Sequence, residues 1–200
     1  VRVPSHAQHG GVLRAELQRE RTVWISTQPH VALAGCFDRA APHDRHQEHD
    51  KFDGRPSRER MLWTVLEEKF EATVKDATPV ISEMRRIKTT VEIEAMRRAS
   101  DSGAISMVEA ITSSRPGIGE WDLESLMSFV HIREGAVGPA YNAIVGSGPN
   151  SNVLHYHAST RLMQAGEVVL IDYGPELDHY VSDITRTWPV DGVWTARMAE

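Results

Sequence analysis

The chain has 200 residues, of which 40% are hydrophobic and 25% charged, and its formal net charge is -6. This composition is typical of a soluble globular protein with one sizeable core or two modest ones. The acidic balance argues against nucleic acid as a partner, since phosphate binding needs a basic face. No apolar stretch approaches the roughly 20 residues that span a bilayer, so no membrane partner is expected.

Cysteine use gives an expectation about the compartment. Cys36 is the single cysteine, so an internal disulfide is excluded and a reducing, cytoplasmic setting is compatible with the sequence. A nucleophilic role is one alternative, but a small buried hydrophobic residue is the more common one. The first residues also lack the apolar core of a signal peptide. We therefore predict a cytoplasmic protein.

The first part of the chain shows short elements separated by a polar segment. Two apolar runs, 22–26 and 30–35, are predicted to be strands. Residues 38–57 are polar, contain two prolines and a glycine, and are predicted to form a loop or linker. Apolar residues at helical spacing then predict a helix over 57–71, with Ser57 as its N-cap.

Within the polar segment, three histidines follow one another at three-residue steps: His43, His46 and His49. Such a cluster binds zinc opportunistically when a framework holds it, but this one has no cysteine and no predicted element around it. A solvated polar loop is therefore the favoured interpretation.

The character of the sequence changes after Pro79, and we predict a domain boundary there, giving domains 1–80 and 81–200. A long helix is predicted over 89–113, because Thr89 and Glu92 have capping-box spacing. The apolar face predicted for it consists of Ile93, Met96, Ala99, Ala104, Met107, Val108 and Ile111. A second helix is predicted over 120–135. The remainder is predicted to be β structure, with runs at 141–148, 153–157, 168–174 and 179–188.

Two aspartates flank the last of these predicted hairpins. If Gly174 faces Val181 across a several-residue loop, then Asp172 faces Asp183, with Cβ atoms about 4.5–5.5 Å apart. Carboxylates at that distance repel, so one must hold a proton or a cation must lie between them. Two divalent metals about 3.5–4 Å apart would suit such a pair. A turn-capping Asp172 and a solvent-facing Asp183 is the alternative, and the pattern alone leaves both open.

Three further features near this hairpin have ordinary alternatives. His155 ends a short apolar run, where a histidine is more often structural than functional, and His157 would share its face in a strand. The segment 146–148, Gly-Ser-Gly, resembles half of a phosphate loop but lacks the rest of the motif, so a turn is predicted. Arg186 is either a partner of the acidic pair or an exposed charge.

Several segments together resemble a known family. They read RRIKTTVEIEAMRRAS, RPGIGEWDLE, YNAIVGSGPNSNVLHYH and AGEVVLIDYGPELDHYVSDITRTWPV. The chain resembles, over roughly 80–200, the Xaa-Pro aminopeptidases (aminopeptidase P) among the pita-bread metallopeptidases, which include prolidase, methionine aminopeptidase and creatinase. The pairing of SDITRT with IDYG, preceded by LHY, is the most specific part, and the seventeen-residue interval from His155 to Asp172 is similar to that of aminopeptidase P.

The resemblance implies roles for four residues. Asp172 would chelate one metal of a dinuclear site and Asp183 would bridge both. His155 would bind the substrate and act in catalysis, by stabilising the tetrahedral intermediate or moving a proton. Tyr141 falls where the family often has a tyrosine near the metal carboxylates, and we assign it to substrate binding. The implied cofactors are two divalent metal ions, manganese first, with cobalt and zinc as alternatives.

The resemblance also implies a fold and an activity. The fold expected is α/β: a partial pita-bread (creatinase/aminopeptidase-like) domain, with two helices on a curved, mostly antiparallel sheet, preceded by a remnant of an N-terminal α/β domain. The activity expected is hydrolysis of the bond between an N-terminal residue and a following proline, in a homo-oligomer. A prolidase-type dipeptidase and a non-catalytic peptide-binding module are the alternatives.

The sequence departs from the family pattern in one important respect. The family's other metal ligands, one His and two Glu, lie beyond the matched hairpin, and the sequence ends at Glu200. The site is therefore expected to be incomplete, and the 200-residue chain alone is expected to bind metal weakly and to lack appreciable peptidase activity.

Overall fold

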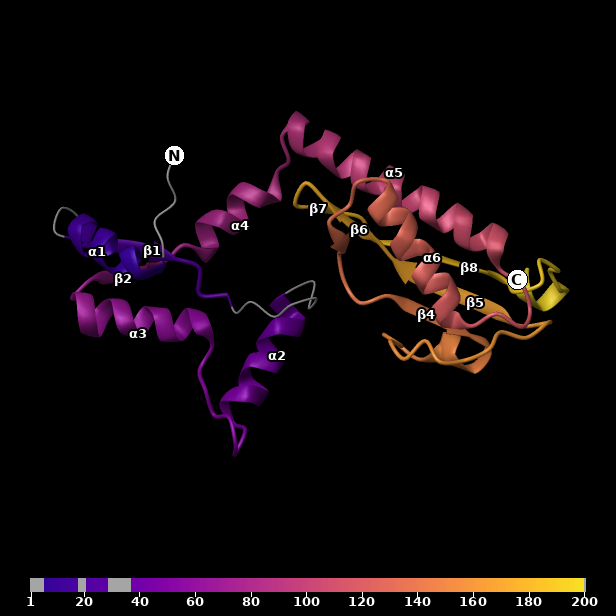
Figure 1. Ribbon diagram of the computed structural model, residues 1–200, viewed down its shortest axis with the longest axis horizontal. Helices are drawn as coiled ribbons and strands as arrows, with labels where there is room; N and C mark the ends of the chain where they lie inside the picture. Colours follow the sequence, from indigo (N-terminus) through magenta and orange to yellow (C-terminus); the bar gives the residue numbers. More distant parts are fainter. Residues whose placement is uncertain (1–5, 18–20, 29–36, 200) are drawn as a thin grey trace. The chain divides into compact units, whose positions relative to one another are not determined.

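The polypeptide divides into two units, Val1–Ile87 and Lys88–Glu200. The structure is a computed structural model that describes residues 6–17, 21–28 and 37–199 (Figure 1). The first unit contains β1 (Thr22–Ile25) and β2 (Thr73–Asp76) with helices α1 (His6–Leu17), α2 (Phe37–Glu48), α3 (Arg58–Phe70) and α4 (Thr78–Arg86). Whether the two units are parts of larger domains stays a prediction.

The first unit is built around a short parallel pair of strands. β1 pairs with β2 in parallel, from Thr22 opposite Thr73 to Ile25 opposite Asp76. Leu66 of α3 is buried against this pair. The helix begins where the sequence predicted, because the hydroxyl of Ser57 accepts a hydrogen bond from the backbone N–H of Arg60. The strand predicted over 22–26 and the helix over 57–71 are confirmed, and the strand predicted over 30–35 lies outside the described residues.

The loop predicted over 38–57 is wrong in its first half, which forms the helix α2. Ala40 and Asp44 lie one turn apart and are both buried, so a burial pattern of helical period runs through a segment that is polar on average. Pro42 lies inside the helix and removes one main-chain donor without ending it. His43 and His46 are exposed on this helix. No group of three or more potential metal-ligating side chains occurs within the described ranges.

The second unit begins with the two predicted helices, α5 (Thr90–Ser113) and α6 (Glu120–Arg133), which pack against each other. The capping box of α5 is formed as predicted: Glu92 accepts from the backbone N–H of Thr89 at 2.6 Å, and the Thr89 hydroxyl accepts from that of Glu92 at 3.3 Å. No helix in the described residues is long and apolar enough to cross a membrane.

The buried face of α5 is rotated from the predicted one and consists mainly of small residues. These residues are Ala95, Ala99, Ser102, Gly103, Ser106, Met107 and Ala110. Ile93, Val108 and Ile111, predicted to face the core, are between 41% and 59% exposed. The small side chains allow a close approach to the strands, since a Cβ on Gly103 would lie 2.6 Å from the hydroxyl of Ser182.

Two antiparallel sheets lie beside these helices (Figure 1). One has the order β4 (Ile144–Ser147), β5 (Val168–Tyr173) and β8 (Ile184–Pro189); the other has β3 (Gly138–Pro139), β6 (Pro175–Leu177) and β7 (Tyr180–Val181). The core of this unit contains Met107, Ala110, Leu123, Met127, Ala143, Val145, Met163, Val169, Ile171, Tyr173, Trp188 and Val190. This core packs α5 and α6 against one face of the sheet that contains β5. Two short 3₁₀ helices, η1 (Gly148–Asn152) and η2 (Ala196–Met198), complete the unit.

The strand predicted over 153–157 is absent, and this described segment forms a turn instead. Gly148 and Pro149 open the 3₁₀ turn η1, which the chain leaves at Val153. His155 has a φ of +55°, in the left-handed region, which a strand does not allow. Val153 and Leu154 are 52% and 85% exposed, so their apolar character does not mark a core strand.

Candidate functional site

Asp172 lies near the end of β5, on the face of the strand that turns away from the core. Along β5 the buried positions are Val169, Ile171 and Tyr173, and the intervening positions are only half-buried. Because side chains alternate between the two faces of a strand, Asp172 shares the face opposite the packed helices. The apolar run before it is therefore compatible with a carboxylate at its end.

The hairpin that joins Asp172 to Asp183 has a different register from the one predicted. Leu177 pairs with Tyr180, so the loop has two residues, and both Asp178 and His179 have positive φ, at 52° and 66°. These angles are the signature of a type I′ turn. Asp172 is consequently opposite Thr185, and the predicted direct pairing with Asp183 is wrong. The turn lacks the glycine that normally marks this type, which is why the sequence pattern missed it.

The two aspartates nevertheless converge on one side chain. Asp183 precedes Thr185 by two positions and so belongs to the same face of the ribbon as Asp172. The hydroxyl of Tyr141 is 2.6 Å from Oδ1 of Asp172 and 3.1 Å from Oδ1 of Asp183, within hydrogen-bond distance of both. Three of the four predicted site residues therefore form one cluster.

The electrostatics of this cluster are set by two neighbouring carboxyl groups, one of them partly buried. Burial is the largest influence on the pKa of Asp172 and raises it; the bond from Tyr141 lowers it, and the charge of Asp183 raises it again, so that the net shift is upward. Burial and the neighbouring Asp172 also raise the pKa of Tyr141, which keeps its hydroxyl protonated as a donor. A positive charge beside the pair would favour its ionised form.

The donor atoms fit hard divalent ions. Two carboxylates and a phenol offer only oxygen ligands, which suit ions such as manganese or magnesium better than thiophilic metals. No third His, Cys, Asp or Glu joins the pair among the described residues. Asp172 and Asp183 would therefore supply two ligands of a centre and not a complete coordination shell.

His155 lies on the turn after η1 and is exposed. Its ring stacks on that of His157, with centroids 6.4 Å apart, and His157 Nδ1 lies 3.2 Å from the carbonyl oxygen of Ala143. The contacts found for His155 in the described part of the chain are with His157 and not with the acidic pair. Ala143 directly precedes Ile144, which pairs with Asp172, so the turn and the acidic pair meet at the same strand, β4.

A buried carboxylate that the sequence analysis passed over lies at the start of α6. Glu120 is fully buried and accepts hydrogen bonds from residues on β4 and on the segment that carries His155. The sequence signal was weak, because an acidic residue in the first turn is common in helices and usually exposed.

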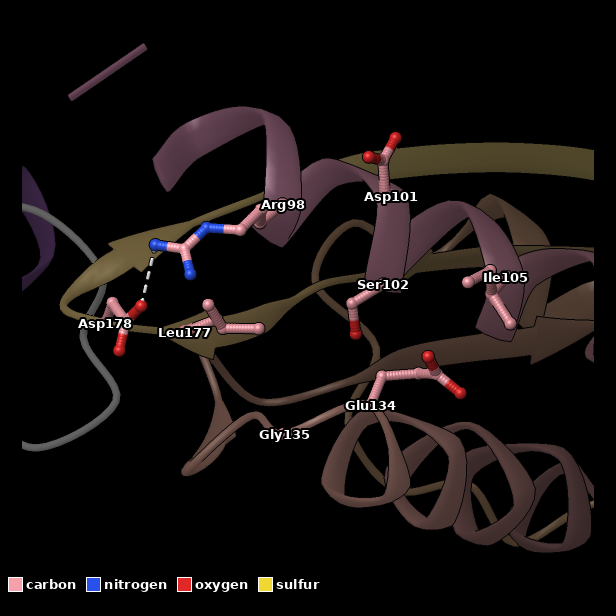
Figure 2. A pocket seen from close by; sticks show the side chains of 8 residues that line it. All are labelled: Arg98, Asp101, Ser102, Ile105, Glu134, Gly135, Leu177 and Asp178. Atoms are coloured by element: carbon pink, nitrogen blue, oxygen red, sulfur yellow. Dashed lines mark hydrogen bonds and ion pairs between the residues drawn. The ribbon is translucent and has the colours of Figure 1, made fainter. Parts of the chain in front are cut away.

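A separate cavity of about 360 Å³ lies between α5, the end of α6 and β6 (Figure 2). Arg98 and Asp178 line it and form an ion pair at 2.8 Å. None of the predicted site residues lines this cavity, so it is not part of the acidic cluster.

Comparison with known proteins identifies a sequence family over more than half of the chain. Residues 94–200 match the model of metallopeptidase family M24. The chain is 43% identical over 129 residues to an Xaa-Pro aminopeptidase of Escherichia coli K12 and 38% identical over 137 residues to human Xaa-Pro aminopeptidase 3. These matches cover 64% and 68% of the chain but only 29% and 27% of the relatives, so the chain spans less than a third of their length.

Solved structures extend the likeness to nearly the whole chain. A zinc-substituted E. coli aminopeptidase P in complex with product has a TM-score of 0.72 at 32% identity, covering 99% of this chain and 41% of that one. An E. coli aminopeptidase P variant in complex with substrate has a TM-score of 0.71 at 33% identity, with 98% and 41% covered. The predicted α/β fold, a partial pita-bread domain, is thereby confirmed.

Proposed function

The chain belongs to metallopeptidase family M24, and on that premise we propose that it contributes to the active site of an Xaa-Pro aminopeptidase. The observation that carries the proposal is the convergence of Asp172 and Asp183 on the hydroxyl of Tyr141. A binding module without a metal would have no use for two neighbouring carboxylates, of which Asp172 has a pKa raised first by burial and then by the charge of Asp183. The likeness to curated Xaa-Pro aminopeptidases supports the same function.

Asp172 and Asp183 are proposed to hold two divalent metal ions. We propose manganese as the natural metal, with cobalt and zinc as alternatives; zinc is the metal named for one similar structure. When bound, such ions lower the pKa of water and make hydroxide available near neutral pH. The hydroxyl of Tyr141 would fix the orientation of both carboxylates and thereby keep them ready for the metals.

His155 is proposed to act on the substrate. Its ring is exposed on a turn, so a substrate can reach it, and a neutral or protonated imidazole can bind a carbonyl oxygen or move a proton. Negative charge develops on the carbonyl oxygen during attack, and a positioned donor such as His155 would stabilise it. The departing proline nitrogen must also be protonated, which requires a proton donor within reach.

The proposed substrate is a peptide with proline at its second position, cleaved after its first residue. We further propose that the protein acts in the cytoplasm and as a homo-oligomer. A preference for Xaa-Pro dipeptides over longer peptides would instead indicate a prolidase-type enzyme. A chain that binds proline-containing peptides in the presence of manganese without cleaving them would indicate a non-catalytic module.

The function can be tested on the natural gene product that contains these residues. We expect the manganese-loaded protein to release the first residue from a Gly-Pro-type tripeptide and to leave a matched Gly-Ala tripeptide uncut. Asp172→Asn and Asp183→Asn should each abolish release, whereas Asp178→Asn, an exposed aspartate at the tip of the same hairpin, should not. Failure of the native protein to cut the tripeptide with manganese, cobalt or zinc would contradict the proposal.

The 200-residue chain alone is expected to behave differently from a complete enzyme. Two carboxylates cannot hold a dinuclear centre, so manganese binding measured by calorimetry should be weak and tripeptide turnover should be absent. Appreciable turnover by the purified 200-residue chain would show that the expected incompleteness of the site is wrong.

A further inference from the structure

Glu120 is the most deeply buried acidic side chain in the described part of the chain, with no exposed surface. It is the first residue of α6, where the helix dipole favours negative charge. That effect alone does not compensate for removing a carboxylate from water. The groups that surround it must do so, and their positions show what the carboxylate holds together.

Both carboxylate oxygens of Glu120 are fully used. Oε1 accepts from the backbone N–H of Ser147 at 2.7 Å and from its hydroxyl at 2.8 Å. Oε2 accepts from the hydroxyl of Tyr156 at 2.9 Å and from the backbone N–H of Arg161 at 3.0 Å. Burial, the largest influence, raises the pKa of Glu120, but the combined bonds from Ser147, Arg161 and Asn150 lower it overall, so the side chain stays ionised.

These donors come from the beginning, the middle and the end of one segment. Asn150 of η1 donates to Oε1 at 3.1 Å, Tyr156 follows His155 directly, and Arg161 closes the segment. The backbone N–H of Glu120 also donates to the carbonyl oxygen of Arg161 at 2.9 Å. One buried side chain therefore fixes the whole turn, in which regular strand pairing is absent.

The same carboxylate ties the turn to the strand beside the acidic pair. Ser147 is the last residue of β4, and Ile144 at the other end of that strand pairs with Asp172. His155 has a left-handed φ of +55°, a conformation that a non-glycine residue keeps only when its surroundings impose it. The residue that follows it, Tyr156, is held in place by its bond to Glu120.

We infer that Glu120 is a positioning residue, which acts through Tyr156 to hold the His155 side chain at a fixed place relative to β4 and the acidic pair. The catalytic part of this inference rests on the proposed function, whereas the geometric part does not. A purely structural anchor would also hold the turn, so the test must follow His155 itself and not only stability.

Tyr156→Phe is the selective variant. It keeps the ring and the bonds from Ser147 and Arg161 to Glu120. It removes the bond from the Tyr156 hydroxyl to Glu120 and the bonds that the same hydroxyl accepts from Asn150 at 2.9 Å and from the backbone N–H of Thr160 at 3.3 Å, all within the turn that carries His155. Glu120→Gln is the more disruptive variant. It replaces one carboxylate oxygen, which accepts hydrogen bonds, by an amide NH2 group, which would face the donors that the oxygen now accepts from. Tyr180→Phe is the matched control, since the Tyr180 hydroxyl also donates to a glutamate, Glu92, at 2.9 Å, on another part of the unit.

The first measurement uses the imidazole resonances of His155 in the 200-residue chain by ¹H–¹³C NMR. In Tyr156→Phe and Glu120→Gln we expect the His155 signal to shift or broaden, while Tyr180→Phe leaves it unchanged. This readout requires no enzyme activity, so it remains decisive if the proposed function fails. An unaltered His155 signal in both variants, with the remaining spectrum showing a folded chain, would overturn the inference.

The second measurement uses the manganese-loaded natural gene product. We expect Tyr156→Phe to lower kcat by roughly tenfold to a hundredfold, since a displacement of about 1 Å of a reacting group has effects of that size. KM, manganese affinity and the kcat of Tyr180→Phe should change little. A Tyr156→Phe protein with reduced thermal stability and native kcat would assign Glu120 a structural role alone and would also overturn the inference.

Discussion

Asp172 lowers the stability of the folded chain when it is ionised, although the proposed metal site requires its ionised form. Burial and the nearby Asp183 raise its pKa, which means that the folded metal-free chain favours the protonated form of this carboxyl. Ionising it as the pH rises through the raised pKa therefore costs stability. A site that is unfavourable without its ligand is a common property of functional centres.

Asp172→Asn should therefore raise the free energy of unfolding of the metal-free chain near neutral pH while it removes manganese binding. Urea unfolding in the presence of a chelator measures the first effect, and manganese titration measures the second. Asp191→Asn is a control of opposite sign, because N–H bonds from Val193 and Gly166 lower the pKa of Asp191 and favour its charge. Destabilisation by Asp172→Asn in chelator would contradict the direction of the shift.

His131 provides a second test at the scale of one residue. It is 1% exposed, and its Nε2 lies 2.7 Å from the hydroxyl oxygen of Ser106. That hydroxyl donates to the carbonyl of Gly103, so it accepts from His131, which fixes the neutral tautomer with the proton on Nε2. Burial lowers the pKa of His131 to about 4.

The folded chain therefore favours neutral His131. The neutral ring contributes its full stabilisation above pH 6.5, and that stabilisation is lost as the pH falls towards 4. The expected loss is on the order of 3 kcal/mol. His131→Phe should reduce the decrease in unfolding free energy between pH 7 and pH 4.5, measured by urea titration at both values. An unchanged pH dependence in the variant would mean that other groups cause it.

The hairpin from β5 to β8 depends on a close main-chain contact at Gly174. A Cβ at this position would lie 1.8 Å from the carbonyl oxygen of Ser182, which is backbone and cannot rotate away. Gly174→Ala should therefore destabilise the chain by about 1–3 kcal/mol. Gly138→Ala is the control, because a Cβ on Gly138 meets nothing within 4 Å. Equal stability of the two variants in denaturant unfolding would contradict this account.

The elements that the sequence predicted are those whose signals are local. The capping box of α5 and the periodic stretches of α5, α6 and β5 depend on residues within a few positions of each other. The helix α2 and the turn at His155 depend on burial and on hydrogen bonds to distant groups, such as that from Tyr156 to Glu120. Their polar or apolar composition therefore misled the prediction.

The prediction about the acidic pair survived an error in register for a physical reason. Asp172 is opposite Thr185 instead of Asp183, which is a shift of two positions. Residues two positions apart in a strand point to the same face, so the shift leaves Asp183 on the face of Asp172. The predicted proximity of the carboxylates was therefore correct, although their direct pairing was not. Their metal-binding roles, and those of Tyr141 and His155, stay predictions.

At the scale of the whole molecule, the second unit exposes a stripe of large apolar side chains on its long helix. Val108 and Ile111 of α5 are 59% and 41% exposed. Apolar surface of this kind favours association with another protein surface.

The 200-residue chain should therefore self-associate at high concentration. Light scattering should show an apparent mass that rises with concentration, and Val108→Glu with Ile111→Glu should reduce that rise because charge at the stripe opposes its burial. Val91→Glu is the control, on an apolar side chain of α5 that lies outside this pair and is 80% exposed. A strictly monomeric wild-type chain at all concentrations would contradict the prediction.

The two-residue turn at Asp178 and His179 makes the number of residues on each side of the hairpin, between either aspartate and the tip, as important as the chemistry of the aspartates. An insertion at the tip would lengthen the loop and leave the ladder of paired residues intact. A single insertion or deletion between Asp172 and the tip would instead rotate one carboxylate to the opposite face of the ribbon. Variation in length should thus be tolerated at the end of this hairpin and excluded along its sides.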